Sequence, residues 1–207
     1  MKNTLKIFVL LMFCTTAKAQ QIVPYNTYFT DENKYTNENL SPKYYKDISN
    51  RLNVFVGDWK YVNGNQTFII TIRKELKVPT EVKDEVKFYS DDLYAHYKLV
   101  QDFGLPTQQT IYTSQKRIRN NHPKEFETIL YGRSYQNNVM SGTVCDVTGP
   151  EPIIEYWEGV PANFAMEVSP YATPITATWK VTRKPGMVFS DQPTLITIPV
   201  DVTLTKM

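Results

Sequence analysis

The feature that most constrains this fold is an alternation of polar and apolar residues on both sides of Asn63-Gly64. Residues 54–62 precede the pair, and residues 67–74 follow it with three apolar side chains on one face. Two alternating runs around Asn-Gly are the strongest short-range signal for a β-hairpin. The stretch therefore predicts two paired strands, each presenting one apolar face to a core.

The same alternation recurs along the chain and predicts an all-β domain. It is present in residues 93–99, 139–147, 175–182 and 198–205, and Asn137-Asn138 favours a second tight turn. Eight to ten short antiparallel strands in one domain either close as a barrel or stack as a sandwich. We expect an up-and-down barrel, because the final strand can pair with the first and remove both sheet edges.

One short helix is expected before the first strand. Ser41 suits an N-cap and Pro42 suits the first helical position. Tyr44, Ile48 and Leu52 follow at a spacing of four residues, which places them on one side of a helix. This is the only helix that the sequence predicts.

Two stretches are expected to be irregular connections. Residues 75–85 are charged and contain Pro79, which predicts a loop. Residues 159–174 contain one glycine and three prolines, which predicts a long connection with little regular structure.

Residues 1–19 have the features of a secretory signal peptide. Lys2 and Lys6 precede an unbroken apolar run at 7–14, and Ala17-Lys18-Ala19 matches an A-x-A cleavage site. We expect cleavage after Ala19 and a product that is secreted or periplasmic. Residues 20–40 are then an irregular N-terminal arm, and residues 41–207 form a single barrel domain.

Removal of this leader changes the charge balance. The leader takes three lysines and no acid, so the 23 basic residues fall to 20 against 21 acidic residues. A near-neutral chain argues against binding nucleic-acid phosphates. Cys145 is then the only cysteine, so no intrachain disulfide is expected. No second apolar stretch approaches the roughly 20 residues of a membrane helix, so we do not expect the chain to span a membrane.

The triplet Gly57-Asp58-Trp59 resembles the calycin pattern of lipocalins and fatty-acid-binding proteins. In those families the tryptophan lies across the barrel floor beside a basic side chain from near the chain end. The resemblance implies a lipocalin-like barrel in which Gly57, Trp59 and Lys206 have structural roles. The family residue at the last position is usually arginine, so Lys206 departs from the pattern.

A closer resemblance covers most of the mature chain. Residues 55–70, 177–181 and 198–206 are similar to an uncharacterised family of small secreted proteins from Bacteroidota-type bacteria, catalogued as a domain of unknown function. This resemblance implies export from a Gram-negative cell. It implies no activity.

Aromatic residues supply the main indication of function. The chain has 14 Tyr, 10 Phe and 3 Trp, and such side chains line ligand pockets as well as cores. We expect Tyr61, Phe68, Tyr97 and Trp179 inside the barrel or at a pocket wall, although core packing alone also explains each. The leading hypothesis is a barrel that binds a small apolar molecule without catalysis. No catalytic residue, metal or cofactor is expected, because no motif for any of them is present.

Two alternatives stay open. The first is a filled barrel without a pocket that acts as an interaction module in the envelope or on the cell surface, through the 20–40 arm and residues 159–174. The second is a carbohydrate-active enzyme that uses Glu155 with Glu158 or Glu151. Glu155 and Glu158 are a poor pair, because side chains three apart on a strand point to opposite faces. No protein partner is indicated by the sequence.

Overall fold

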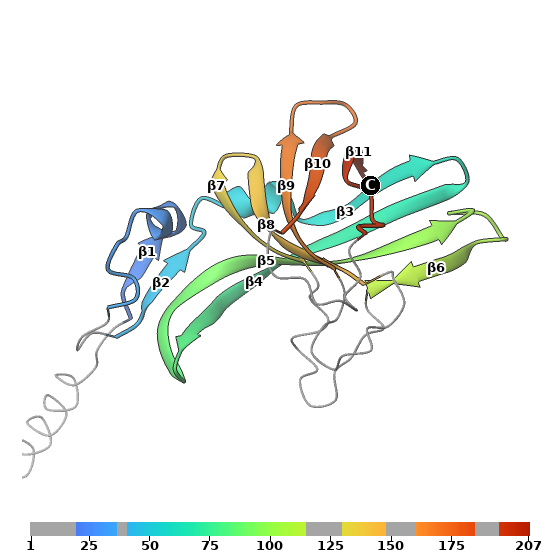
Figure 1. Cartoon of the computed structure of the whole chain (residues 1–207). Helices are drawn as coiled ribbons and strands as arrows, with labels where there is room; N and C mark the ends of the chain where they lie inside the picture. Colours follow the sequence, from blue (N-terminus) through green and yellow to red (C-terminus); the bar gives the residue numbers. More distant parts are fainter. Residues whose placement is uncertain (1–19, 37–40, 115–129, 148–159, 185–194) are drawn as a thin grey trace, which may run out of the picture. The chain divides into compact units, whose positions relative to one another are not determined.

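Eight strands of the computed structural model close into an antiparallel barrel, in which chain order and spatial order agree (Figure 1). The structure describes residues 20–36, 41–114, 130–147, 160–184 and 195–207. The barrel strands, in the order in which they neighbour one another, are β3 (Gly57–Asn63), β4 (Gln66–Val82), β5 (Glu85–Gln101), β7 (Leu130–Gln136), β8 (Val139–Asp146), β9 (Val160–Ser169), β10 (Thr176–Arg183) and β11 (Asp201–Lys206).

The ring closes because the last strand pairs with the first. Lys206 lies opposite Trp59 and Thr205 opposite Lys60 in the antiparallel pair β11–β3. A further strand, β6 (Gln109–Thr113), pairs with β5 outside the ring. The next strand, β7, also pairs with β5 and continues the ring. The expected all-β, up-and-down antiparallel barrel is therefore confirmed.

Tight turns connect the strands where the sequence predicts them. The β3–β4 hairpin pairs Asn63 with Gln66, and Gly64 takes the positive φ of 61° that this turn requires. The β7–β8 hairpin pairs Gln136 with Val139, and Asn138 has a φ of 64°. Both hairpin predictions are confirmed, the first with a turn one residue later than the sequence suggested.

The interior of the barrel is filled with large side chains. Strand alternation places every second residue inward, and these residues are almost without solvent exposure. At most 3% of the surface is exposed for Trp59, Phe68, Ile70, Ile72, Leu93, Ala95, Tyr97, Phe164, Met166, Trp179 and Leu204.

The chain divides into two compact units. The barrel unit comprises residues 47–76 and 91–207, and the N-terminal unit comprises residues up to 46 together with 77–90. The chain passes from one unit to the other within β4 and within β5. In the residues of the expected irregular arm, the structure has a short strand and a 3-10 helix, namely β1 (Ile22–Pro24) and η1 (Tyr25–Phe29).

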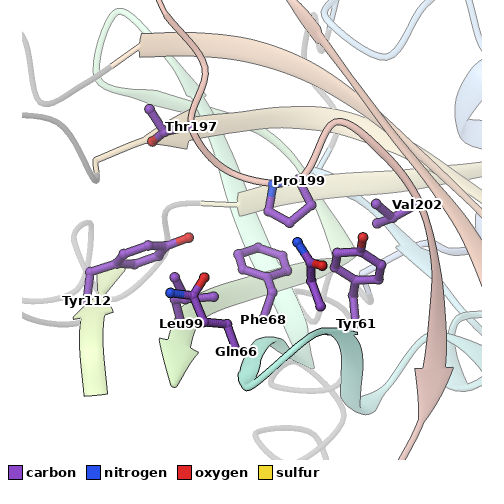
Figure 2. A pocket seen from close by; sticks show the side chains of 9 residues that line it. Tyr61, Gln66, Phe68, Leu99, Tyr112, Thr197, Pro199 and Val202 are labelled. Carbon is purple, nitrogen blue, oxygen red and sulfur yellow. The ribbon is translucent and has the colours of Figure 1, made fainter. Parts of the chain in front are cut away.

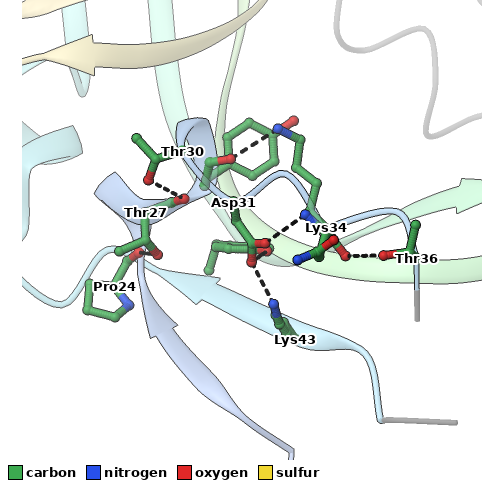
Figure 3. Close-up of polar contacts among 10 residues, drawn as sticks. Pro24, Thr27, Thr30, Asp31, Lys34, Thr36 and Lys43 are labelled. Atoms are coloured by element: carbon green, nitrogen blue, oxygen red, sulfur yellow. Dashed lines mark hydrogen bonds and ion pairs between the residues drawn. The ribbon is translucent and has the colours of Figure 1, made fainter. Parts of the chain in front are cut away.

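The N-terminal unit is built on an aromatic cluster. Strand β2 (Lys43–Lys46) runs parallel to β1 and to the first part of β5, and Tyr28, Tyr45 and Phe88 pack edge to face between 5.3 and 5.6 Å. Asp31 accepts a hydrogen bond from Lys43 Nζ at 2.6 Å (Figure 3). It also accepts one from the Tyr45 hydroxyl at 2.6 Å. The hydrogen bond from Lys43 lowers the pKa of the Asp31 carboxyl. Both donors belong to β2, so Asp31 connects the residues that follow η1 to that strand.

The expected helix over residues 41–52 is wrong. Residues 43–46 form β2, and a 3-10 helix, η2 (Arg51–Val54), follows. Strand β2 has partners on both sides, and it buries both Tyr44 and Tyr45. The Asp47 carboxylate accepts the backbone N–H groups of Arg51 and Leu52, the first two residues of η2. Ile48 was expected on the apolar helix face, yet 60% of it is exposed.

Both expected irregular connections contain strands. Strand β4 continues to Val82, and the two-residue turn Lys83–Asp84, with positive φ at both positions, leads directly into β5. Strand β9 occupies much of 159–174 and has partners on both edges, β8 and β10. In both places, pairing with neighbouring strands supplies hydrogen-bond partners for the backbone. The charges and prolines of these stretches therefore wrongly indicate loops.

Candidate functional site

A pocket of about 300 Å³ opens in the barrel unit, beside the β3–β4 hairpin (Figure 2). Strands β3, β4, β5, β6 and β11 contribute to it, together with the segment that precedes β11. Nine described residues line the pocket: Tyr61, Asn63, Gln66, Phe68, Leu99, Tyr112, Thr197, Pro199 and Val202.

The register of the hairpin explains why these side chains meet. Tyr61 lies opposite Phe68, and Asn63 lies opposite Gln66. Residues two apart on a strand share a face, so these two pairs continue the inward-facing row that begins at Trp59. Trp59 is fully buried, whereas Asn63 at the hairpin end is exposed. The pocket is therefore the mouth of the barrel, where the filled interior ends.

Tyr97 supports the pocket from behind. Its ring centroid lies 5.6 Å from that of Phe68 and 6.1 Å from that of Tyr112. Its hydroxyl donates to the carbonyl of Cys145 and accepts the N–H of Val147, both at 2.8 Å. Burial raises the pKa of this hydroxyl. Tyr97 is not among the lining residues; it packs against two of the lining rings and holds them in position.

Trp179 also lies behind the pocket wall. Its ring stacks on Phe164 with centroids 5.1 Å apart, and its indole Nε1 donates to the carbonyl of Pro199 at 2.9 Å. Pro199 lines the pocket. Trp179 thus holds one wall in place, and only Tyr61 and Phe68 of the four expected ligand-binding residues line the cavity.

A buried carboxylate holds the same wall. Asp146, 2% exposed, accepts hydrogen bonds at Oδ2 from the N–H and the hydroxyl of Thr197 and from the N–H of Ile198. Residues 197–199, which we call the wall segment, are therefore anchored by Asp146 and Trp179. No local sequence pattern predicts this contact, because it joins residues far apart in the chain. Asn63 and Leu99 also line the pocket, although we did not expect them there. Each lies two residues beyond an expected residue, Tyr61 or Tyr97, and residues two apart on a strand share a face, so alternation predicts both.

A comparison with protein families identifies the chain. The model of the family of unknown function DUF6705 matches residues 1–149. The chain belongs to the DUF6705 family. The match extends through β8 and includes most of the strands that form the pocket. No curated protein and no solved structure matches this DUF6705 chain.

The barrel end away from the pocket brings together the three expected structural residues of this DUF6705 chain. Lys206 Nζ lies 5.2 Å from the ring centroid of Trp59 and donates to the carbonyl of Val54 at 3.0 Å. Burial lowers the pKa of Lys206. Gly57 has a φ of 120°, and a Cβ there would lie 3.4 Å from Lys206 Cε. Trp59 Nε1 donates to the carbonyl of Phe55 at 2.7 Å.

Several expectations for this DUF6705 chain fall outside the described residues. They are the leader at 1–19 and the acidic residues Glu151, Glu155 and Glu158. Among the residues that are described, no helix is long and apolar enough to cross a membrane.

Proposed function

We propose that this chain is an exported, lipocalin-like barrel that binds a small, mostly apolar ligand at its mouth and performs no chemistry on it. The observation that carries the proposal is the pocket between β3, β4 and the wall segment. Its volume of about 300 Å³ is at the lower end of the range for small-molecule sites. Phe68, Leu99, Pro199 and Val202 supply the apolar part of its lining, beside polar groups from the other five residues.

The filled interior limits the ligand to the mouth. Phe68 and Tyr97 are both at most 1% exposed and occupy the space below the pocket. A long alkyl chain that extends along the barrel axis therefore has no room beneath them. A compact ligand fits the cavity as it stands.

The filled interior also supports the second candidate, an interaction module of the envelope or cell surface. This alternative loses part of its expected contact surface, because residues 160–169 form β9 within the ring and pair with a strand on both edges. They do not form the exposed connection that was expected to make the contact. The mouth pocket favours ligand binding over this alternative.

Native mass spectrometry on protein purified from a bacterial periplasm tests the proposal. We expect a non-covalent adduct of up to a few hundred daltons that disappears on denaturation. Val202→Trp fills the pocket and should remove the adduct. Val200→Trp is the matched control, because Val200 is 46% exposed and does not line the pocket.

Two outcomes would contradict ligand binding. One is an adduct that survives in Val202→Trp, which would place the ligand elsewhere. The other is a bare mass for the wild-type protein, both as purified and after incubation with a mixture of lipids, fatty acids and neutral metabolites. The second outcome would favour the interaction module.

A further inference from the structure

We infer that the mouth pocket selects an uncharged ring compound that carries hydrogen-bonding groups on one edge. This inference rests on the proposed function and defines the chemical class of its ligand. It follows from the order in which side chains line the pocket and from the absence of charged side chains among the nine described lining residues.

The lining has two levels, which the hairpin register sets. The deeper level holds the paired rings of Tyr61 and Phe68, and the next level toward the turn holds the paired amides of Asn63 and Gln66. Phe68 is 1% exposed, whereas Asn63 is exposed. A ligand that enters from the turn side therefore meets amides at its outer edge and aromatic faces at its inner end.

The deeper level suits a ring. Aromatic side chains prefer offset or edge-to-face contact with another ring, worth about 0.5–1.5 kcal/mol beyond the area buried. Tyr97 packs behind Phe68 at 5.6 Å and keeps its ring from turning away. Leu99 and Val202 complete the apolar sides. An aromatic or flat cyclic group fills this level better than a flexible chain does.

The outer level suits a neutral edge with both donors and acceptors. A primary amide offers two donors and one acceptor oxygen, and the side chains of Asn63 and Gln66, which lie opposite each other, both line the mouth. Figure 2 shows Gln66 among the lining side chains. Thr197 adds a hydroxyl to the lining, but that hydroxyl already donates to Asp146. The two amides, together with the phenol hydroxyls of Tyr61 and Tyr112, are thus the polar side-chain groups that the described lining offers to a ligand.

Charge is the second selection criterion. None of the nine described lining residues is Lys, Arg, His, Asp or Glu. One charged group is hydrogen-bonded to the lining: the Asp146 carboxylate accepts the N–H and the hydroxyl of Thr197. A buried charge without a partner is costly, and a negative ligand would also be repelled by Asp146. Fatty acids and other carboxylates are therefore poor ligands.

Three probes of nearly equal size test this class: benzamide, benzoate and toluene. They share one ring, and they differ in charge and in the presence of a hydrogen-bonding edge. We expect ligand-detected NMR titrations of the full chain at pH 7 to show benzamide binding at least about tenfold more tightly than benzoate, the factor that about one good hydrogen bond or one unpaired charge produces. Val202→Trp should abolish benzamide binding.

Two substitutions test the amide edge. Asn63→Leu and Gln66→Leu should each weaken benzamide by up to about tenfold and leave toluene unchanged or tighter. Asn65→Leu is the matched control, because Asn65 is exposed in the turn between them and does not line the pocket. Benzoate binding as tightly as benzamide would overturn the charge argument, and toluene binding as tightly would overturn the polar edge.

The failure of this inference differs from the failure of the proposed function. A co-purified adduct that is lost in Val202→Trp but proves to be a carboxylate or a linear chain leaves the binding function intact and overturns the ligand class. If neither a co-purified adduct nor any of the three probes binds, both proposals fail together.

Discussion

Lys206 lies over the indole ring of Trp59, with its Nζ 5.2 Å from the ring centroid, and so joins the last barrel strand to the first. The two residues are also direct partners in the β3–β11 register. The barrel therefore closes through a backbone ladder and through a cation–π contact at the same point. Trp59 is fully buried, and its removal should loosen this closure.

Truncation of the indole gives the first prediction. Trp59→Ala should lower the free energy of unfolding by about 3–5 kcal/mol, because it leaves a cavity where β3 meets β11. Urea unfolding followed by far-UV circular dichroism measures the change. Val62→Ala, on the same strand but 55% exposed, should change it by no more than about 0.5 kcal/mol. A loss below about 1 kcal/mol for Trp59→Ala would mean that the indole does not support closure.

Close packing of β7 against β8 gives the second prediction. Gly132 lies opposite Gly142, and a Cβ on Gly142 would lie 2.0 Å from the carbonyl oxygen of Tyr131. Gly142→Ala must therefore move backbone, and we expect a loss of about 3 kcal/mol or more in unfolding free energy. Gly64→Ala has open space around its Cβ, so only its positive φ opposes it, at about 1–2 kcal/mol. Equal losses for the two variants would contradict this account.

Buried tyrosines give a third prediction, on alkaline stability. Burial raises the pKa of Tyr97, Tyr112 and Tyr131, and it raises the pKa of Tyr94 to about 12. In the unfolded chain tyrosine titrates near pH 10. These groups contribute stability that is fully present below about pH 10 and is lost as the pH rises toward their folded-state values. Stability should therefore fall steeply above pH 10.

Tyr112→Phe isolates one of these groups. At pH 11 the variant should recover up to about 1 kcal/mol of stability relative to wild type, after allowance for partial exposure. Tyr171→Phe is the control, because Tyr171 is 97% exposed, and it should leave the alkaline limb unchanged. Urea midpoints measured between pH 8 and pH 11 provide the comparison. Parallel curves for wild type and Tyr112→Phe would refute the burial argument.

Local signals in the sequence predicted the barrel better than its connections. The turns at Gly64 and Asn138 depend on neighbouring residues, so the sequence predicts them. The alternation of the last strand is also a local pattern, and it predicts that this strand forms. Val160, Ala162 and Phe164 alternate in β9 and indicate a strand, whereas the prolines in and after this stretch indicate a loop. Pro161 is tolerated because it stands at the beginning of the strand.

The pocket could be predicted only in part, for a physical reason. Tyr61 and Phe68 lie opposite each other in one hairpin, so alternation alone places them on a common face. The wall segment is positioned by Asp146 and Trp179, which come from different strands. Such contacts depend on the closed ring, and no local pattern in the sequence specifies them. The sequence predicts Trp179 at the ligand, but Trp179 lies behind the wall segment, a position that alternation alone does not specify.

Removal of the Asp146 carboxylate gives the last prediction. Asp146→Ala leaves the N–H and hydroxyl of Thr197 and the N–H of Ile198 without their acceptor. We expect a loss of about 1–3 kcal/mol in unfolding free energy and faster hydrogen exchange at both amides, since local opening sets their protection. Binding at the mouth should weaken by at least about tenfold, because the wall segment no longer holds its position.

Two further variants separate the wall from general instability. Asp146→Asn keeps one acceptor oxygen, so its exchange rates and affinity should lie between those of wild type and Asp146→Ala. Asp201→Ala removes an exposed carboxylate from β11 and should change neither. If Asp146→Ala exchanges uniformly faster across all barrel strands, the carboxylate supports the whole barrel. If only the amides of the wall segment respond, the carboxylate acts on the pocket wall, which is the outcome expected here.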